Sequence, residues 1–491
     1  MSHANAAAHL GGHEPSTGEE DRASRLLLCA GSLALVIASY WLLNYSAFPL
    51  FDGVWTGNRE ASAIASGLAL SALAFCAYWR PRLFTSRRML AATVGASLGG
   101  ALLTVAGVGL ANAPILVAGA TLGTIAAGLA SIAIGFACLS LDLRSVGLIV
   151  ISAYVIAYAC RALFALLDQL TCVALFFALP LIGTFMIARY AKPVFNQNFS
   201  QGSPAELALT SPSSFLPFEH RFFLTLLLFR FIYGFTLTFG ELERTPLLAF
   251  GALVPLAAVL LWALMRKEQM SPETLFQLSI LCSVAGFLLI TLGGSGADTA
   301  NLLLTCGTGF FEMFMYYMLI ALSAKNPLAA LPVMAWGSAM ASWGTLLGAN
   351  FGRMVNGFAT DPTLISGVIA FIVFFIVAYL ALALNGQPFT TTLQGITPPA
   401  PMLTATADDG ETISLEERCA ELGSRHELTV REQEVFEYLA RGRNIRFIEE
   451  ELVVSYNTVK THVSHIYAKL GVHSHQELID LVENGGSSTE R

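Results

Sequence analysis

The sequence predicts an all-α protein in which a polytopic membrane bundle of twelve helices precedes a soluble domain of four short helices. Two observations lead to this fold class. The chain of 491 residues is 55% hydrophobic and only 12% charged, whereas soluble domains contain about a quarter charged residues. Lysine and arginine are also scarce between residues 26 and 384 and become denser after residue 418. The first region therefore has the composition of a membrane domain and the last that of a soluble one.

The apolar region divides into segments of about 20 residues, the length that an α-helix needs to cross a bilayer. Short polar stretches such as "RPRLFTSRR" (80–88) and "GGSGAD" (293–298) separate them. A soluble core cannot accommodate so many apolar runs. The predicted spans cover residues 26–46, 61–79, 89–110, 114–138, 146–164, 170–188, 222–239, 246–265, 273–293, 299–324, 328–350 and 363–384.

The basic residues of the loops predict the orientation, because cytoplasmic loops are enriched in lysine and arginine. With a cytoplasmic N-terminus, the outer loops contain only three such residues, Arg59, Arg244 and Arg353. An even number of spans then places both termini in the cytoplasm of a bacterial cell. The inner loops contain thirteen basic residues: Arg22, Arg25, Arg80, Arg82, Arg87, Arg88, Arg144, Arg189, Lys192, Arg221, Arg266, Lys267 and Lys325.

Composition also predicts the boundaries between the parts of the chain. The N-terminal residues are acidic and lack the basic start of a signal peptide, so we expect a disordered cytoplasmic tail. A stretch rich in Ser, Pro and Asn divides the membrane region in two, and a stretch rich in Thr, Pro and Ala forms a flexible linker after it. The expected parts are a tail (1–24), two membrane halves (25–189 and 221–385) around a cytoplasmic loop (190–220), the linker (386–424), the soluble domain (425–484) and a second tail (485–491).

The six-plus-six layout resembles the major facilitator superfamily, whose two halves surround a central cavity. The resemblance covers about residues 25–385 and rests on layout. The family's Gly-x-x-x-Asp-Arg-x-Gly-Arg-Arg loop is not intact, because 80–88 has basic residues but neither an acidic residue nor a glycine. Glycines four residues apart predict close helix packing; they are Gly344, Gly348 and Gly352, Gly95 and Gly99, and Gly119 and Gly123.

Ionisable residues inside three predicted spans are candidate ligand contacts, because charges are costly in the bilayer. Arg230 lies in the middle of the seventh span and Glu312 in the middle of the tenth. They can pair as a structural latch, or they can contact a ligand; the two roles are compatible. Arg161 can face the cavity or reach the outer membrane surface. Tyr316, Tyr233, Tyr158 and Tyr154 lie on the same helix faces as these charges.

The last 60 residues contain clear helix boundaries. Thr429 and Glu432 form a capping box before an apolar run, and a second helix follows near residues 446–453. Ser455 caps a third helix, in which Val459, Val463, Ile466 and Leu470 form an apolar stripe that ends at Gly471. A fourth helix begins at the capping pair Ser474 and Glu477. Four short helices with a tight turn between the second and third are typical of a helix-turn-helix domain.

The segment "LTVREQEVFEYLARG…VSYNTVKTHVSHIYAKLGVHSHQEL" resembles the LuxR-type helix-turn-helix over residues 425–484. Ile445 stands where an Asn is usual, and Glu449 where a small Ala is usual. The resemblance implies binding to double-stranded DNA as a dimer on a two-fold promoter site. Seven basic against ten acidic residues in 425–484 indicate that a single copy binds weakly, because affinity depends on phosphate neutralisation. Candidate DNA contacts are Asn457, Thr458, Lys460, Thr461, Ser464, His465 and Lys469.

These features predict a membrane-tethered, one-component transcription regulator that senses a small molecule through its membrane domain. The alternative is a transporter of the major facilitator type with a fused regulatory helix-turn-helix module. None of the eight cysteines has metal-ligand spacing, and no catalytic constellation stands out. We therefore expect no metal, no cofactor and no enzymatic activity, with the lipid bilayer, DNA and an unknown small molecule as partners.

Overall fold

In a computed structural model of the chain, the described residues form helices joined by turns and short loops, and they contain no strand. The described residues are 17–164, 166–198, 204–205, 215–236, 246–266, 271–292, 297–358, 388–396, 415–443 and 445–483. The membrane bundle contains α1 (Thr17–Leu42), η1 (Leu43–Ala47), α2 (Phe48–Phe51), α3 (Asn58–Trp79), η2 (Pro81–Leu83), α4 (Ser86–Gly109), α5 (Ala113–Cys138), α6 (Leu143–Phe164), α7 (Gln169–Asn198), α9 (Arg221–Thr236), α10 (Pro246–Met265), α11 (Pro272–Leu292), α12 (Ala297–Lys325), η4 (Pro327–Ala329) and α13 (Ala330–Phe358).

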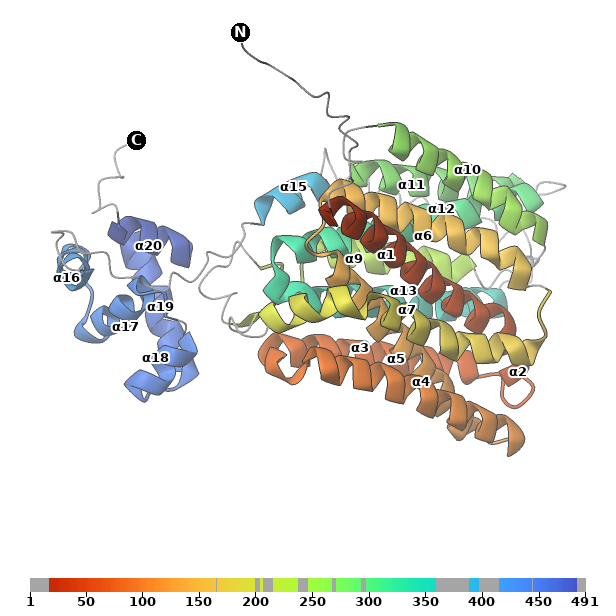
Figure 1. The fold of residues 1–491 in the computed structure, drawn as a ribbon, viewed down its shortest axis with the longest axis horizontal. Helices are drawn as coiled ribbons and strands as arrows, with labels where there is room; N and C mark the ends of the chain where they lie inside the picture. The colour runs from red at the N-terminus through yellow and green to blue at the C-terminus, as the bar shows by residue number, and fades with distance from the viewer. Residues whose placement is uncertain are drawn as a thin grey trace, which may run out of the picture.

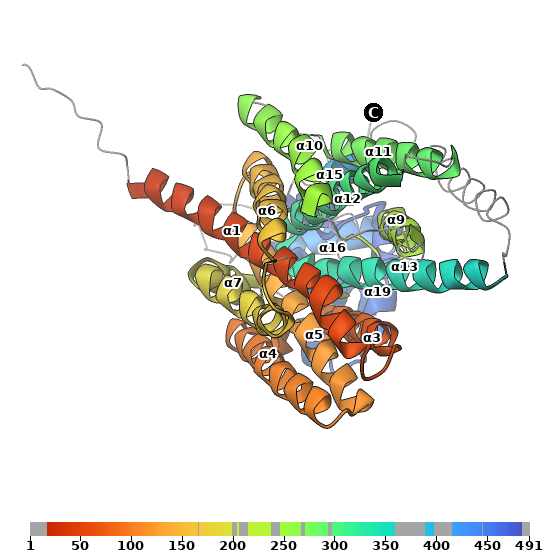
Figure 2. The ribbon, with the colours of Figure 1, turned by 90° about the vertical axis from the view of Figure 1, so that its right-hand side faces the viewer.

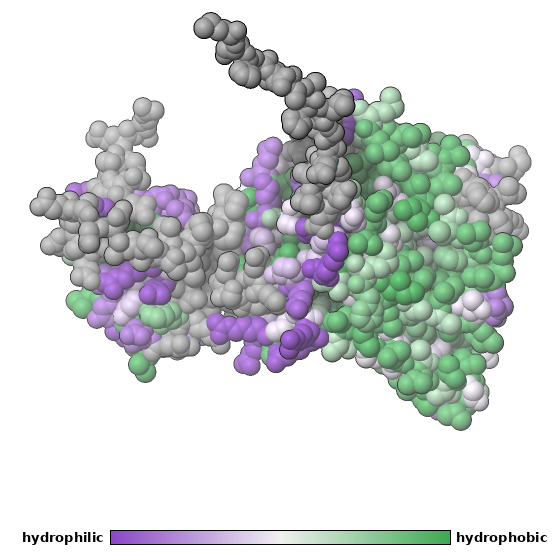
Figure 3. All heavy atoms as spheres, in the orientation of Figure 1, coloured by the Kyte–Doolittle hydropathy of each residue, from purple (hydrophilic) through white to green (hydrophobic). Residues whose placement is uncertain are grey.

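The predicted fold class is confirmed. Each of the first eleven predicted spans overlaps a described helix, and the twelfth, 363–384, lies outside the described residues. Eight of the described helices are long and apolar enough to cross a membrane. The flank of the bundle is covered by apolar side chains, and hydrophilic side chains gather at the end where α15 (Pro388–Gly395) lies (Figure 3).

The bundle is built from two groups of helices. Viewed along the bundle, α3, α4, α5 and α7 lie on one side, and α9, α11, α12 and α13 lie on the other (Figure 2). The two groups meet where α13 packs along α3, and α10 packs along α6 beside them. A space between two such halves is the expected place for a ligand.

Two predicted glycine pairs bring helix backbones together, and one does not. A Cβ atom on Gly348 of α13 would lie 1.9 Å from the Phe231 carbonyl oxygen, so only glycine allows α9 to approach this closely. Gly119 likewise lies against Gly100 of α4, where a Cβ would be 3.0 Å from a carbonyl oxygen. The prediction for Gly95 and Gly99 is wrong, because no helix backbone approaches either of them; a Cβ on Gly99 would meet only the Leu122 side chain, at 3.7 Å. Gly100 has that role because it lies on the face of α4 that meets α5.

Three predicted boundaries need correction. Helix α1 begins at Thr17, within the predicted disordered tail, and Arg22 ties its first turns to Asp142 at the start of α6. Helix α7 continues to Asn198, past the predicted end of the first half at residue 189. The predicted linker 386–424 is helical at both ends, where it contains α15 and α16 (Leu415–Arg425). The sequence did not reveal these two helices because each has only a few apolar residues, spaced for one buried face, in an otherwise polar stretch.

The C-terminal helices are α16, α17 (Val430–Ala440), α18 (Ile445–Leu452), α19 (Tyr456–Leu470) and α20 (His475–Glu483) (Figure 1). The capping box of Thr429 and Glu432, the Ser455 cap and the left-handed Gly471 are confirmed. The apolar stripe of α19 is buried, as predicted. Ile445 is also fully buried at the start of α18, so this departure from the LuxR-type pattern contributes to the core.

Candidate ligand cavity and DNA-binding face

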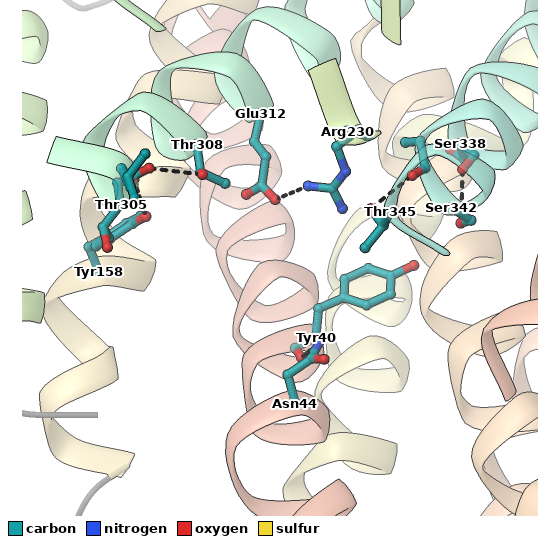
Figure 4. Close-up of polar contacts among 12 residues, drawn as sticks. Tyr40, Asn44, Tyr158, Arg230, Thr305, Thr308, Glu312, Ser338, Ser342 and Thr345 are labelled. Atoms are coloured by element: carbon teal, nitrogen blue, oxygen red, sulfur yellow. Dashed lines mark hydrogen bonds and ion pairs between the residues drawn. The ribbon is translucent and has the colours of Figure 1, made fainter. Parts of the chain in front are cut away.

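Arg230 on α9 and Glu312 on α12 form an ion pair inside the bundle, with 2.8 Å between Nη1 and Oε1 (Figure 4). Their side chains are 17% and 19% exposed. The guanidinium also lies over the Tyr233 ring, 4.8 Å from its centroid. The buried Nε of Arg230 has no hydrogen-bond partner among the described residues. A buried N–H without an acceptor costs about 1–3 kcal/mol, so an acceptor bound here would be stabilised.

Arg230 lies at one end of a cavity of about 410 Å³ between the two groups of helices. Residues of α1, α3, α5, α9 and α13 line this cavity, together with the π-helical turn η1. The walls combine apolar side chains with hydroxyl groups. Among the lining residues are Tyr40, Asn44, Ser62, Ser66, Ser342 and Thr345. Such a mixture suits a small molecule with an apolar body and a few polar groups.

A second ion pair lies at the other end of the cavity, where Arg353 Nη1 is 2.7 Å from Glu60 Oε1. Gly344 packs against Arg230, and Arg353 follows nine residues later on the same helix, α13. At 1.5 Å per residue, the two cations are separated by roughly 14 Å along the helix. The cavity therefore extends toward the end of the bundle near α2, opposite the end that carries α15 (Figure 1).

The structure brings only some of the predicted ligand residues together. Arg230, Glu312 and Tyr233 form one group, and the Tyr316 hydroxyl nearby accepts a hydrogen bond from Ser131 at 3.2 Å. Arg161 and Tyr158 form a second group around the aromatic rings of Trp41 and Tyr45. Arg161 lies 4.5 Å from the Tyr45 centroid and 5.6 Å from the Trp41 centroid, and the Tyr158 ring packs edge-on against Trp41 at 4.7 Å.

Sequence reasoning missed most of the cavity lining. A polar stripe was visible on the eleventh predicted span, where Ser342 and Thr345 lie three residues apart on one helix face. Tyr40 and Asn44 gave no such indication. They face the cavity because the helix widens into the π-turn η1 directly after α1, and π-turns often occur at functional sites.

The predicted DNA-contact residues lie on the outer face of α19. All seven side chains are exposed. Among them Thr458 shares a 2.8 Å hydrogen bond with Ser455, and Thr461 donates to the Asn457 carbonyl at 3.0 Å. Lys460 has no hydrogen bond or ion pair within the described part of the chain. Its charge is available to a base edge or a phosphate.

Lys469 has intramolecular partners. Its Nζ donates to Glu432 Oε2 at 2.7 Å and to the Glu427 carbonyl at 2.8 Å. Glu432 is buried and also accepts from the Thr429 amide, while His465 Nδ1 lies 3.5 Å from its other oxygen. The hydrogen bond from Lys469, followed by that from the Thr429 amide, lowers the pKa of Glu432 to about 2. Much of the Lys469 charge is therefore neutralised within the domain.

Helix α15, which precedes the C-terminal helices in the chain, is held to the membrane bundle at a junction with α11 and α12. Glu273, at the start of α11, accepts hydrogen bonds from the Phe389 and Thr390 amides at 3.1 and 2.7 Å and from the Thr390 hydroxyl at 2.8 Å. The Phe389 ring is buried, 4.6 Å from Phe314 and 5.0 Å from Phe276 between ring centroids. A carboxylate at the N-terminus of a helix is stabilising, so α15 is held to the bundle by charge and by packing.

Comparison with known proteins identifies the C-terminal domain. The profile of the luxR family of bacterial regulatory proteins matches residues 426–482. Spore germination protein GerE of Bacillus subtilis is 39% identical over 66 residues, which are 13% of this chain and 89% of that protein. The fimbriae Z protein of Salmonella typhimurium is 39% identical over 64 residues, but the chain spans only 30% of its length.

The membrane bundle is similar to solved transporters at the level of fold. A bacterial homologue of the iron transporter ferroportin, in an outward-facing state with soaked iron, superposes with a TM-score of 0.53 at 12% identity, covering 75% of this chain and 98% of that one. The human organic anion transporter MFSD10 superposes with a TM-score of 0.52 at 14% identity, covering 72% and 99%.

The fold and the match of the C-terminal domain describe a polytopic membrane protein whose helical bundle is similar in fold to solved transporters and which carries a helix-turn-helix DNA-binding domain. Through that domain, the chain belongs to the luxR family of bacterial regulatory proteins.

Proposed function

We propose that the protein is a membrane-tethered, one-component transcription regulator. A small molecule binds in the cavity between the two halves, and the change in the bundle alters how the helix-turn-helix domain is presented to promoter DNA. The observation that carries this proposal is the α15 junction, because it links the described core of the bundle to the chain segment that precedes the DNA-binding helices. Both termini lie in the cytoplasm in this proposal, and the DNA-binding domain pairs on a two-fold site.

The ligand is anionic or zwitterionic. The support is the unpartnered Nε of Arg230 beside the cavity, together with the Arg353 guanidinium at the other end. A ligand carboxylate would accept hydrogen bonds from Arg230 and compete with Glu312 for the guanidinium. Binding would then weaken the ion pair that joins α9 to α12.

The ion pair is close to the α15 junction along one helix. Phe314, whose ring contacts Phe389 of α15, lies two positions after Glu312. Phe311, the neighbour of Glu312, stacks on Phe229, the neighbour of Arg230, with 3.8 Å between ring centroids. A movement of α12 against α9 therefore changes the packing around Phe389. Coupling of this kind requires two states of the bundle that the ligand binds with different affinity.

Ligand-dependent stabilisation tests the site. Candidate compounds are screened for those that raise the unfolding temperature of the purified protein, because a bound ligand stabilises by RT ln(1 + [L]/Kd). We expect Arg230→Gln to remain folded and to abolish this stabilisation. Unchanged stabilisation in both Arg230→Gln and Glu312→Gln would exclude the cavity site, and the group around Arg161 and Tyr158 would be tested next.

Phe389→Ala tests the coupling. We expect this variant to bind the compound but to lose the transcriptional response, measured as promoter activity in a deletion strain with and without the compound. Phe287→Ala is the matched control, since it also removes a buried aromatic ring from the bundle but lies about 21 Å along α11 from Glu273. A normal response in Phe389→Ala, or equal loss in both variants, would contradict coupling through α15.

The fold similarity to transporters favours one alternative, a transporter whose helix-turn-helix module regulates it. Uptake of the stabilising compound, in labelled form, into proteoliposomes distinguishes the two. Saturable uptake that is independent of DNA, together with an unchanged transcript profile in the deletion strain, would favour transport.

A further inference from the structure

A second hollow of about 180 Å³ lies between α4 and α7, with Ala133 of α5 also lining it. It is at the end of the bundle where α4 begins, next to the short helix η2. The hollow exists because three lining residues have small side chains, Ala133, Ala188 and Ala191. It is separate from the central cavity, and the two have no lining residue in common.

Two cations line the hollow, Arg87 on α4 and Lys192 on α7. Both side chains are exposed, and within the described residues neither has a hydrogen bond or an ion pair. The neighbouring segment 80–88 contains no acidic residue that could neutralise them. The first turn of α4 adds the partial positive charge of a helix N-terminus.

The remaining lining is apolar or carries hydroxyl groups, including Leu90, Ile187 and Thr184. Farther along the same two helices, large apolar side chains are exposed on the surface of the bundle. Leu98 of α4 is 55% exposed and lies roughly 16 Å along the helix from Arg87, and Phe185 of α7 is 58% exposed. Such exposure is expected where helices contact lipid chains. The two cations therefore lie where an exposed apolar flank ends, a position that suits a lipid headgroup.

We propose that this hollow binds the headgroup of an anionic phospholipid. The phosphodiester lies between Arg87 and Lys192, and the acyl chains follow the exposed apolar residues of α4 and α7. Basic pockets between membrane helices bind anionic headgroups in this way. A lipid bound here joins α4 to α7 and is independent of the small molecule in the central cavity.

The test measures thermal unfolding of the full-length, delipidated protein in neutral detergent. Dioctanoyl phosphatidylglycerol, dioctanoyl phosphatidylcholine and inorganic phosphate are added separately. We expect only phosphatidylglycerol to raise the unfolding temperature at submillimolar concentration. The double variant Arg87→Gln/Lys192→Gln should weaken the apparent affinity about 30-fold, from the typical contribution of two cations near an anionic surface.

The matched control is Arg80→Gln/Arg82→Gln, which removes the same charge at the same end from exposed side chains outside the hollow. It should retain the effect of phosphatidylglycerol. Ala188→Leu fills the hollow without changing charge, and it should also reduce the stabilisation by phosphatidylglycerol. This variant tests the site even if the charge variant fails to fold. Equal loss in both double variants, equal stabilisation by phosphatidylcholine, or equal stabilisation by inorganic phosphate would overturn the lipid site.

Discussion

Breaking the Arg230–Glu312 ion pair gives a prediction whose magnitude follows from the structure. The paired atoms are 2.8 Å apart, and each side chain is less than one-fifth exposed. Glu312 accepts no other hydrogen bond among the described residues. Removing one partner of a buried pair costs about 3–5 kcal/mol, because the other charge stays desolvated. The adjoining cavity admits water beside Arg230, so we expect about 3 kcal/mol for Arg230→Gln and for Glu312→Gln.

The double variant Arg230→Gln/Glu312→Gln leaves two neutral amides that can bond to each other, so we expect it to lose only about 1–2 kcal/mol. The three variants and the parent form a double-mutant cycle, measured by unfolding in mixed micelles. The cycle should give a coupling energy of at least about 2 kcal/mol. If the effects of the single variants add to within about 0.5 kcal/mol, the pair does not stabilise the bundle and the latch interpretation is refuted.

Four further predictions concern the other parts of the chain. Lys460→Ala/Thr461→Ala should keep the fold and lower the preference for the promoter sequence over other DNA by about 1–3 kcal/mol, measured by footprinting. Unchanged protection of the promoter would exclude this face. Lys469→Ala should instead destabilise the domain by about 1–3 kcal/mol, because the buried Glu432 carboxylate loses its lysine partner; an effect only on the salt dependence of DNA binding would contradict this. Since the pKa of Glu432 is lowered to about 2, its stabilisation is complete above the ordinary glutamate value of about 4.3 and is lost as the pH falls toward 2. The protection factors of amides in α17 and α19, which correct for the intrinsic exchange rate at each pH, should fall over that window in the parent but not in Glu432→Gln. An alkaline phosphatase fusion after Gly386 should be inactive, and an active fusion would reverse the proposed orientation.

The sequence alone was sufficient for the features that are encoded locally. Hydropathy over about 20 residues located the membrane helices, because the bilayer imposes a length and a polarity on each of them. Side chains at helix ends located the DNA-binding helices, because Thr429 and Ser455 bond to amides within their own first turn. Arg230 and Glu312 were selected as a candidate latch or ligand site because a charge within an apolar span is rare.

Only the tertiary structure decided which distant residues meet. Lys469 was a candidate phosphate contact from its position on α19, yet its partner Glu432 lies on α17, 37 residues earlier. Helix α15 could not be predicted from its own polar stretch, because the carboxylate that holds its N-terminus belongs to Glu273. That residue is 117 positions away from Thr390. The cavity likewise depends on how α1, α3 and α13 cross. Such contacts are set by the packing of whole helices against one another, and no local pattern of residues specifies that packing.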